Sequence, residues 1–273
     1  MSPDMQVTPY DRASAAVVVA GIAGKPEREM SETDIGKPPP EVMELLQDPR
    51  LAGLKYRGPG RSKAGAVLQP SGPPPNIGES PYVLFRVNYE DASPAKVTWT
   101  NEPPGLVSLL QMGTGKGFAR LTETPHFEEQ RPRPATPREA WVYTGWLVAS
   151  PRFAQIVREH AGDSIATAPV DWVFADGKKL DGYVFLDVLP LIHAYDYKRT
   201  EVVVLIGEQG PYISSLGYPR ALRRELRADL PIFRDAFQPD DIFVSRALAR
   251  ALLAAKLRGF DFEDPARQGR TDP

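Results

Sequence analysis

Three side chains in the C-terminal half of the chain have the residue types of a hydrolase triad. His193 could act as general base, Asp196 could orient it, and Ser215 could be the nucleophile. Ser214 is the neighbouring choice of nucleophile. Neither serine lies in a Gly-x-Ser-x-Gly turn, and no glycine-rich oxyanion loop follows them. A hydrolase therefore stays open as an alternative, but without the turn that usually exposes such a serine.

Metal chemistry has one candidate, His126 with Glu128 and Glu129, which could hold a divalent cation on a loop. The proline before His126 and the surrounding charges favour a solvated loop instead. The other two histidines, His160 and His193, also lack a second histidine at metal-ligand spacing. Because the chain has no cysteine, disulfides, thiolate catalysis and Cys-ligated zinc are excluded. We expect no metal site.

Residues 113–117 read Gly-Thr-Gly-Lys-Gly and invite comparison with a phosphate-binding loop. A Walker loop needs glycine four residues before the Gly-Lys pair and serine or threonine after it. This chain has Leu110 and Gly117 at those positions, so a flexible turn is the better interpretation. We expect no bound cofactor.

Partner binding is the better use of the aromatic residues. Residues 193–199 mix two tyrosines with charged side chains on an expected loop, and protein interfaces favour rigid aromatic anchors ringed by charge. An ordinary turn between strands would have the same composition and remains the alternative. The predicted partner-binding residues are Tyr195, Asp196 and Tyr197, followed by Asp171, Trp172 and Asp176 in an upstream hairpin.

Two segments of the chain combine a short apolar strand, a serine helix cap and a helix closed by glycine. Residues 242–244 are followed by Ser245, and residues 146–148 are followed by Ala149 and Ser150. Gly162 is expected to close the earlier helix and Gly259 the later one. The apolar stripes expected on the two helices are Phe153, Ile156 and Val157, and Leu248, Leu252, Leu253, Ala255 and Leu257.

The rest of the C-terminal two thirds predicts mainly strands. Tyr82–Tyr89 is expected to form a hairpin with Val97–Thr100, and Val170–Phe174 with Tyr183–Leu189 across the Asp176-Gly177 turn. Residues 201–206 and 212–213 predict further strands, residues 220–230 a short basic helix, and residues 122–137 a surface passage.

Composition changes near residue 80 and suggests the domain organisation. Residues 1–80 are rich in proline and glycine and predict an extended or loop-rich N-terminal arm with one helix over 41–51. Residues 81–265 predict an α+β domain, whose mixed, mainly antiparallel sheet is flanked by a few helices, and residues 266–273 a C-terminal tail.

Charge and hydropathy exclude several classes of partner. A formal net charge of −2 with interspersed signs gives no basic surplus for nucleic acid. No segment approaches the roughly 18 apolar residues of a membrane span, so we expect no membrane contact. Residues 15–24 are apolar but follow an acidic start, which favours a buried segment over a signal peptide.

Residues 183–197, reading YVFLDVLPLIHAYDY, resemble the pattern of immunity protein family eleven, a bacterial family that guards against polymorphic toxins. Ile232-Phe233-Arg234, Phe243-Val244-Ser245 and the helix ending Leu257-x-Gly259-Phe260 are similar to later motifs of that family, in the same order. Residues 147–150 resemble an upstream Val-Ser strand, with Ala149 inserted. The resemblance covers residues 141–264 best.

The resemblance implies a cytoplasmic protein without catalytic residues that binds and neutralises a cognate toxin, often encoded beside it. The expected mechanism is occlusion, in which a preformed surface covers the active site of the toxin. An adaptor or chaperone that loads a secreted effector would also bind one partner and is the closest alternative. The hydrolase with His193, Asp196 and Ser215 is the more distant one.

Overall fold

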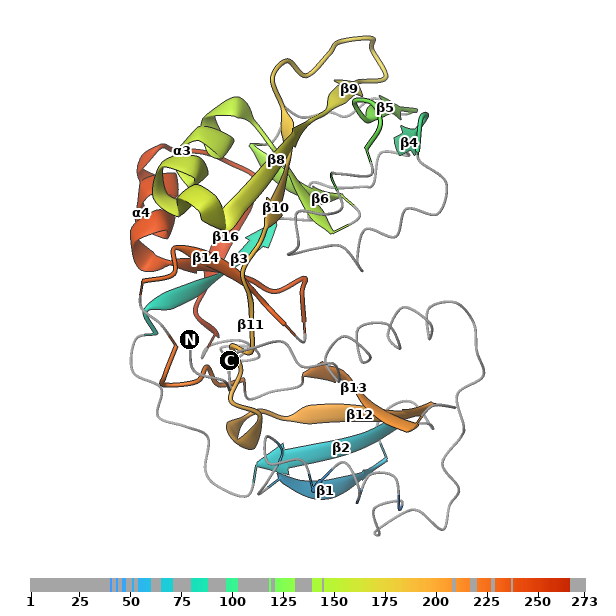
Figure 1. The fold of residues 1–273 in the computed structure, drawn as a ribbon, viewed down its shortest axis with the longest axis vertical. Helices are drawn as coiled ribbons and strands as arrows, with labels where there is room; N and C mark the ends of the chain where they lie inside the picture. Colours follow the sequence, from blue (N-terminus) through green and yellow to red (C-terminus); the bar gives the residue numbers. More distant parts are fainter. Residues whose placement is uncertain are drawn as a thin grey trace, which may run out of the picture.

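The computed structural model describes most of the chain between residues 54 and 265. The described residues are 40, 43, 46–47, 51, 54–59, 65–70, 80–87, 97–102, 118, 121–130, 139–143, 145–207, 210–216, 220–226, 229–236 and 238–265. They form an α+β fold in which two α-helices accompany four sheets of mainly antiparallel strands (Figure 1). The predicted fold class is confirmed.

A five-stranded sheet, the central sheet, separates two hydrophobic cores. Its strands are, in spatial order, β11 Leu191–Ile192, β14 Ile232–Asp235, β15 Ile242–Ser245, β3 Tyr82–Val87 and β16 Phe260–Glu263. Successive side chains of a strand point to opposite faces. Val83 and Phe85 therefore pack into the first core, whereas Tyr82 and Leu84 pack into the second.

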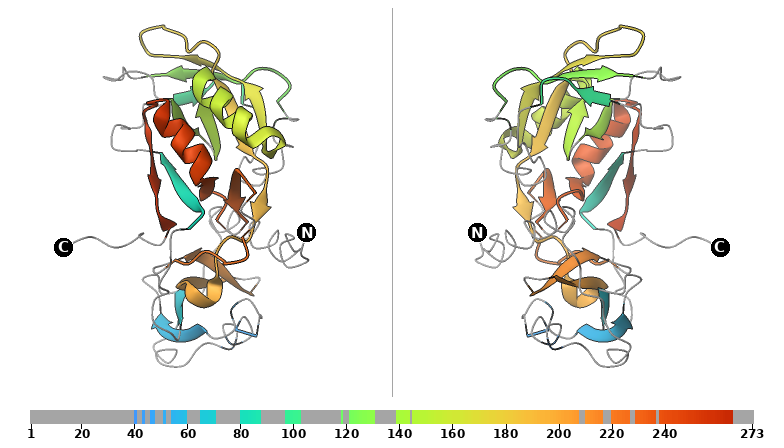
Figure 2. Two further views of the ribbon diagram at one scale, coloured as in Figure 1. Left: turned by 90° about the vertical axis from the view of Figure 1, so that its left-hand side faces the viewer. Right: turned by 90° about the vertical axis from the view of Figure 1, so that its right-hand side faces the viewer.

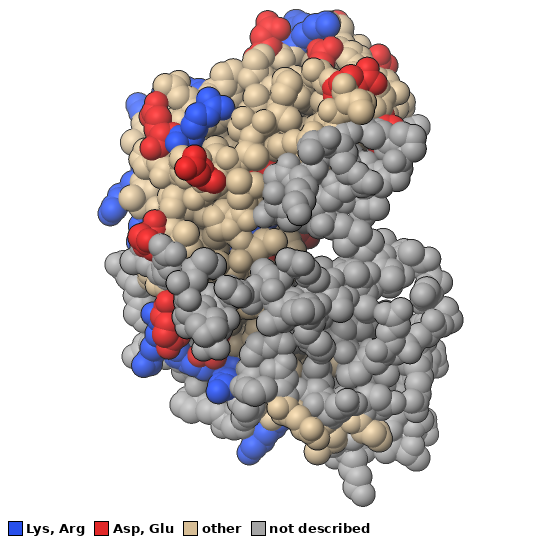
Figure 3. Space-filling model, in the orientation of Figure 1, with Lys and Arg blue, Asp and Glu red and all other residues tan. Residues whose placement is uncertain are grey.

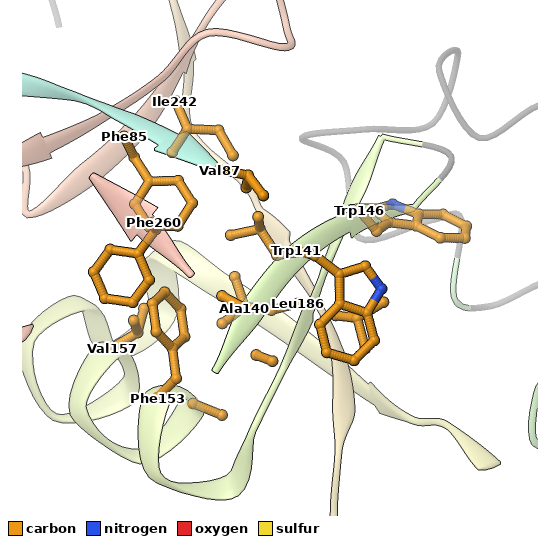
Figure 4. Packing of buried hydrophobic residues seen from close by; sticks show 14 of the residues in the cluster. Phe85, Val87, Ala140, Trp141, Trp146, Phe153, Val157, Leu186, Ile242 and Phe260 are labelled. Atoms are coloured by element: carbon orange, nitrogen blue, oxygen red, sulfur yellow. The ribbon is translucent and has the colours of Figure 1, made fainter. Parts of the chain in front are cut away.

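The first core is closed by a second sheet and the two helices. The sheet consists of β6 Ala140–Tyr143, β7 Trp146–Ala149, β10 Val184–Val188 and β8 Ile165–Pro169, and the helices are α3 Pro151–Ala161 and α4 Arg246–Ala254. The helices lie side by side on the outside of the molecule (Figure 2). Between them and the central sheet the rings of Phe85, Phe153 and Phe260 meet, with centroids 5.2–5.8 Å apart (Figure 4).

The second core joins the central sheet to a sheet that contains N-terminal strands. This sheet is β1 Leu54–Pro59, β2 Gly65–Pro70, β12 Val202–Gly207 and β13 Gly210–Leu216. Leu68 of β2 and Val204 of β12 are both 0% exposed. The expectation of an extended or loop-rich arm did not include these strands, in which pairing with a distant strand satisfies the backbone groups despite the surrounding glycine and proline.

A three-stranded sheet overturns the hairpin expected between residues 82–89 and 97–100. Its strands are β4 Val97–Trp99, β5 His126–Glu129 and β9 Asp171–Val173. β4 pairs with β5, while the neighbours of β3 are β15 and β16. β5 also corrects the surface passage expected over 122–137, since Phe127 is 0% exposed. The buried aromatic side chain outweighs the polar composition around it.

The turn at Asp176-Gly177 is confirmed and reverses the chain, but the register of the hairpin differs from the expected one, because Val184–Val188 pairs with residues 165–169 and not with 170–174. Gly177 has φ +82° and its N–H donates to the carbonyl of Phe174 at 2.8 Å. Val173 bridges Lys179, the N–H of Leu180 donates to the carbonyl of Trp172 at 2.9 Å, and the pairing continues as β10 with β8. On its other side β10 pairs with β7. The residues of the turn determine where the chain reverses, whereas the burial of β10 between two strands determines which residues it pairs with.

Residues 220–226 are not helical, in contrast to the basic helix expected over 220–230. The N–H of Asp196 donates to the carbonyl of Ala221, and the N–H of Arg223 donates to the carbonyl of Ala194, at 2.8 and 2.9 Å. The helix was expected because Leu222 and Leu226 are spaced i, i+4. Both leucines are buried, but an i, i+4 pair alone does not distinguish a helix from an extended segment.

Both serine caps are confirmed, and the later helix is shorter than expected. Ser150 accepts from the N–H of Phe153 at 3.1 Å, and Ser245 accepts from that of Leu248 at 3.2 Å. α4 ends at Ala254, and Lys256 takes the left-handed conformation with φ +56° before the chain turns into β16. Leu253 is 58% exposed and not part of the buried stripe, because it is rotated about 100° from Leu252.

Several expectations lie outside the described residues. They are the apolar segment 15–24, most of the helix over 41–51, the glycine-rich segment 113–117 and the tail 266–273. Within the described part of the chain, neither helix has the length and apolar character needed to cross a membrane.

Candidate partner-binding surface

The register between β5 and β9 places His126 beside Asp171 on the outward face of the three-stranded sheet. His126 Nδ1 lies 2.8 Å from Asp171 Oδ2, and His126 Nε2 lies 3.4 Å from Glu128 Oε1. Lys179 Nζ lies 3.6 Å from the same oxygen of Asp171. The side chains of His126 and Asp171 are 30% and 36% exposed, so a partner can reach this polar face.

The opposite face of the same two strands is core. The rings of Phe127 and Trp172 stack with centroids 4.9 Å apart, and both residues are 0% exposed. Trp172 Nε1 donates to Glu129 Oε1 at 2.9 Å, which satisfies the indole in the interior. Trp172 therefore holds β9 in register and fixes the position of Asp171, while its own ring is away from the surface.

The turn after β9 carries an exposed pair of opposite charges. Asp176 Oδ1 accepts from the N–H of Lys178 at 3.1 Å, and Lys178 Nζ lies 2.8 Å from Asp176 Oδ2. The hydrogen bonds from Lys178 hold the pKa of Asp176 below its ordinary value, and Asp176 raises the pKa of Lys178. The turn lies at the upper end of the molecule, where charged side chains of both signs gather (Figures 1 and 3).

Tyr195 and Tyr197 lie in the second core, with exposed fractions of 1% and 5%. Tyr195 Oη donates to Asp241 Oδ2 at 2.7 Å. The same carboxylate accepts from Arg220 Nη1 and Arg86 Nη1, each at 3.0 Å. Burial, reinforced by the charge of Asp241, raises the pKa of Tyr195, so its hydroxyl stays a donor at neutral pH.

Asp196 is half-buried and caps a short turn at the surface. Its Oδ1 accepts from the N–H of Lys198 at 3.1 Å, which begins the 3-10 helix η6, Tyr197–Arg199. η6 leads into β12, whereas β9 lies at the opposite end of the molecule (Figure 1). The structure therefore divides the six predicted residues into two groups. In each group the carboxylates are accessible and the aromatic rings are interior.

Burial separates His193, the general base of the hydrolase alternative, from solvent. His193 is 3% exposed and its ring lies 6.4 Å from that of Tyr197. The carboxylate of Asp196 accepts from Lys198, and Ser215 belongs to β13, where it pairs with Val203. A general base has to reach the proton that it removes, and this imidazole has almost no accessible surface.

Metal-binding side chains are not clustered in the described residues: no group of three or more His, Asp and Glu there could hold a metal ion. His126 contacts Asp171 and Glu128, whereas Glu129 accepts from the buried Trp172 on the opposite face. His160, in the last turn of α3, has its Nδ1 3.0 Å from the carbonyl oxygen of Ile156.

Two buried charged groups, Asp241 and Arg234, were given no structural role from the sequence, where Arg234 entered only as part of the Ile232-Phe233-Arg234 motif. Arg234 is 1% exposed and donates through Nη2 to the carbonyl of Gly145 at 2.9 Å and through Nη1 to that of Pro239. Burial lowers the pKa of Arg234 to about 10, opposed by the charge of Asp187. An Asp-Asp pair after a proline has the pattern of a solvated turn, so nothing local in the sequence distinguishes Asp241.

Comparison with protein families decides the relationship that these motifs suggested. A family model described as Immunity protein family (Imm11) matches residues 71–267, which is more than half of the chain. The chain belongs to the Imm11 family. The Imm11 match starts upstream of the residues 141–264 that carry the resemblance best, and it includes β3, β4 and β5. It starts after β1 and β2, although these strands complete a sheet with β12 inside the matched region.

The Imm11 match also supports the expectation of a protein that binds and does not catalyse. Comparison with curated proteins found no match. The roles of Asp171, Trp172, Asp176, Tyr195, Asp196 and Tyr197 in binding a partner stay predictions.

Proposed function

We propose that the protein binds a cognate bacterial toxin in the cytoplasm and neutralises it by covering the active site of the toxin. The observation that carries the proposal is the Imm11 match over residues 71–267. A rigid surface suits this role, because preorganised side chains lose little freedom on binding. The proposed partner is encoded beside this protein and is neither nucleic acid nor membrane.

The accessible carboxylates are the proposed contact residues. Asp171 is held by His126 and Lys179, Asp176 by Lys178, and Asp196 by the turn that it caps. Each is therefore fixed before a partner arrives. The buried rings of Trp172, Tyr195 and Tyr197 support these positions from below. Asp171 and Asp176, which lie at one end of the molecule, would together complement a basic active-site cleft and steer its approach, and Asp196 would make a separate contact at the opposite end.

The test is co-expression with the product of the adjacent gene in a sensitive bacterium. We expect the neighbouring protein alone to kill, the pair to survive, and the two proteins to purify as one complex. A toxin from an unrelated locus serves as the control for specificity and should kill in the presence of this protein. Co-purification without survival would point to an effector-loading adaptor instead, and a harmless neighbour would contradict the proposal.

A further inference from the structure

β8 is an edge strand whose outer backbone groups can be identified. It lies at the end of the sheet β6-β7-β10-β8 and pairs on one side with β10, antiparallel. Just outside the strand, the N–H of Leu189 donates to the carbonyl of Ser164 at 2.9 Å, and the N–H of Val170 donates to the carbonyl of Tyr183 at 3.3 Å. Backbone groups alternate in direction along a strand, so residues 164, 166, 168 and 170 face β10.

The alternate residues of β8 face away from the sheet. The N–H and C=O groups of Ile165 and Thr167 and the C=O of Pro169 point outward, and within the described part of the chain no strand lies beyond them. Unpaired edges are usually protected by charged side chains, proline, bulges or a covering element, and β8 has a proline only at its last position, Pro169. β8 has no charged residue, and its pairing with β10 runs without a bulge.

The surroundings of β8 favour an uncharged extended segment as its occupant. Thr167 and Pro169 are exposed, and the surface beside α3, where β8 lies, is mainly uncharged (Figures 1 and 3). A cation borders the strand on the α3 side, where Arg158 Nη2 lies 3.4 Å from Thr167 Oγ1. β8 also leads directly, through Val170, into Asp171 of the candidate surface. The edge strand β8 and the candidate surface at Asp171 therefore belong to one continuous segment of the chain.

We propose that β8 docks an extended segment of the toxin, which adds to the sheet as a further strand. The inference rests on the proposed immunity function and states how the complex is held together. Backbone hydrogen bonds to Ile165, Thr167 and Pro169 provide the pairing, as in other cases of strand addition. The chemistry of the edge selects a segment of small or β-branched uncharged residues, with an acidic side chain where the strand passes Arg158.

Amide hydrogen exchange, residue by residue, of the protein alone and bound to the product of the adjacent gene tests the proposal. In the free protein the amides of Ile165 and Thr167 should exchange quickly, whereas those of Ala166 and Ala168, which face β10, are already protected. In the complex we expect exchange at Ile165 and Thr167 to slow at least tenfold. A complex in which these two amides exchange as before would overturn the inference and leave the immunity function standing. Failure of the wild-type protein to form any complex would overturn both.

A matched pair of variants gives a second measurement. Thr167→Pro removes an outward N–H without removing a bond to β10, and it should weaken binding roughly tenfold or more. Thr167→Val also lacks the hydroxyl but keeps the N–H, so it should weaken binding far less. Unchanged melting temperatures would show that both variants fold. Equal affinities of the two folded variants would contradict strand addition at β8.

Discussion

At the residue scale, burial decides which charges matter for stability. Asp241 and Asp176 both pair with cations at close range, but the side chain of Asp241 is 5% exposed and that of Asp176 is 51% exposed. Water stabilises two exposed charges almost as well as the charges stabilise each other, so an exposed ion pair contributes little to the free energy of unfolding. In the interior, by contrast, loss of one partner leaves the others desolvated and without a counter-charge.

Asp241→Ala is therefore expected to destabilise the protein by roughly 3–5 kcal/mol, because it leaves Arg220 and the hydroxyl of Tyr195 without their acceptor. Tyr195→Phe removes one donor only and should cost about 1.5–3 kcal/mol. Urea denaturation measures the free energy of unfolding of each variant. Asp176→Ala is the exposed control and should unfold with the wild type. An Asp241→Ala variant as stable as this control would show that the network is not a stabilising one.

At the element scale, the same strand, serine cap and helix occur twice in the first core. Ser245 accepts a single hydrogen bond from the backbone of α4. Ser150 does the same for α3 and also donates to Glu139 Oε2, while its N–H donates to the carbonyl of Glu139 at 2.8 Å. The N–H of Ser245 likewise donates to a distant carbonyl, that of Pro231, at 2.8 Å, so the two caps differ in the hydroxyl of Ser150, which connects α3 to the carboxylate of the residue before β6.

Replacement of the two cap residues should separate these roles. Ser245→Ala is expected to cost about 1 kcal/mol, the usual value for a lost N-cap. Ser150→Ala should cost more, about 2 kcal/mol, because the carboxylate of Glu139 also loses its donor. Chemical denaturation gives both values. Ser150→Thr, which keeps the hydroxyl, is the control. A Ser150→Ala variant no less stable than Ser245→Ala would show that the bond to Glu139 does not contribute.

Features fixed by neighbouring residues were predictable from the sequence, and strand partners were not. The caps at Ser150 and Ser245 and the turn at Gly177 depend on hydrogen bonds within a few residues. β3, in contrast, pairs with β15 and β16, far along the chain, so its nearest candidate strand was the wrong partner. The candidate site divides in the same way. The sequence showed that tyrosines and aspartates occur there, but the burial of Tyr195 depends on a hydrogen bond to Asp241, 46 residues later.

At the scale of the whole molecule, one sheet connects two cores. Successive residues on β3 and β15 belong alternately to the first and the second core. The packing of each core therefore depends on the same five-stranded sheet. All four tryptophans of the chain, Trp99, Trp141, Trp146 and Trp172, belong to the first core. Leu68 on β2 belongs to the second. Tryptophan fluorescence therefore reports on one core while a substitution at Leu68 weakens the other.

Leu68→Ala should lower the free energy of unfolding measured by tryptophan fluorescence by roughly 2–5 kcal/mol, the usual cost of a buried leucine. The reason is cooperativity: loss of packing on one face of the central sheet destabilises both faces, and circular dichroism should give the same transition. Leu253→Ala on α4, where the leucine is 58% exposed, is the matched control and should change little. The result also tests whether residues 1–80 are a separate arm. If they are, the tryptophan transition of Leu68→Ala will coincide with that of the wild type, and the two cores will unfold independently.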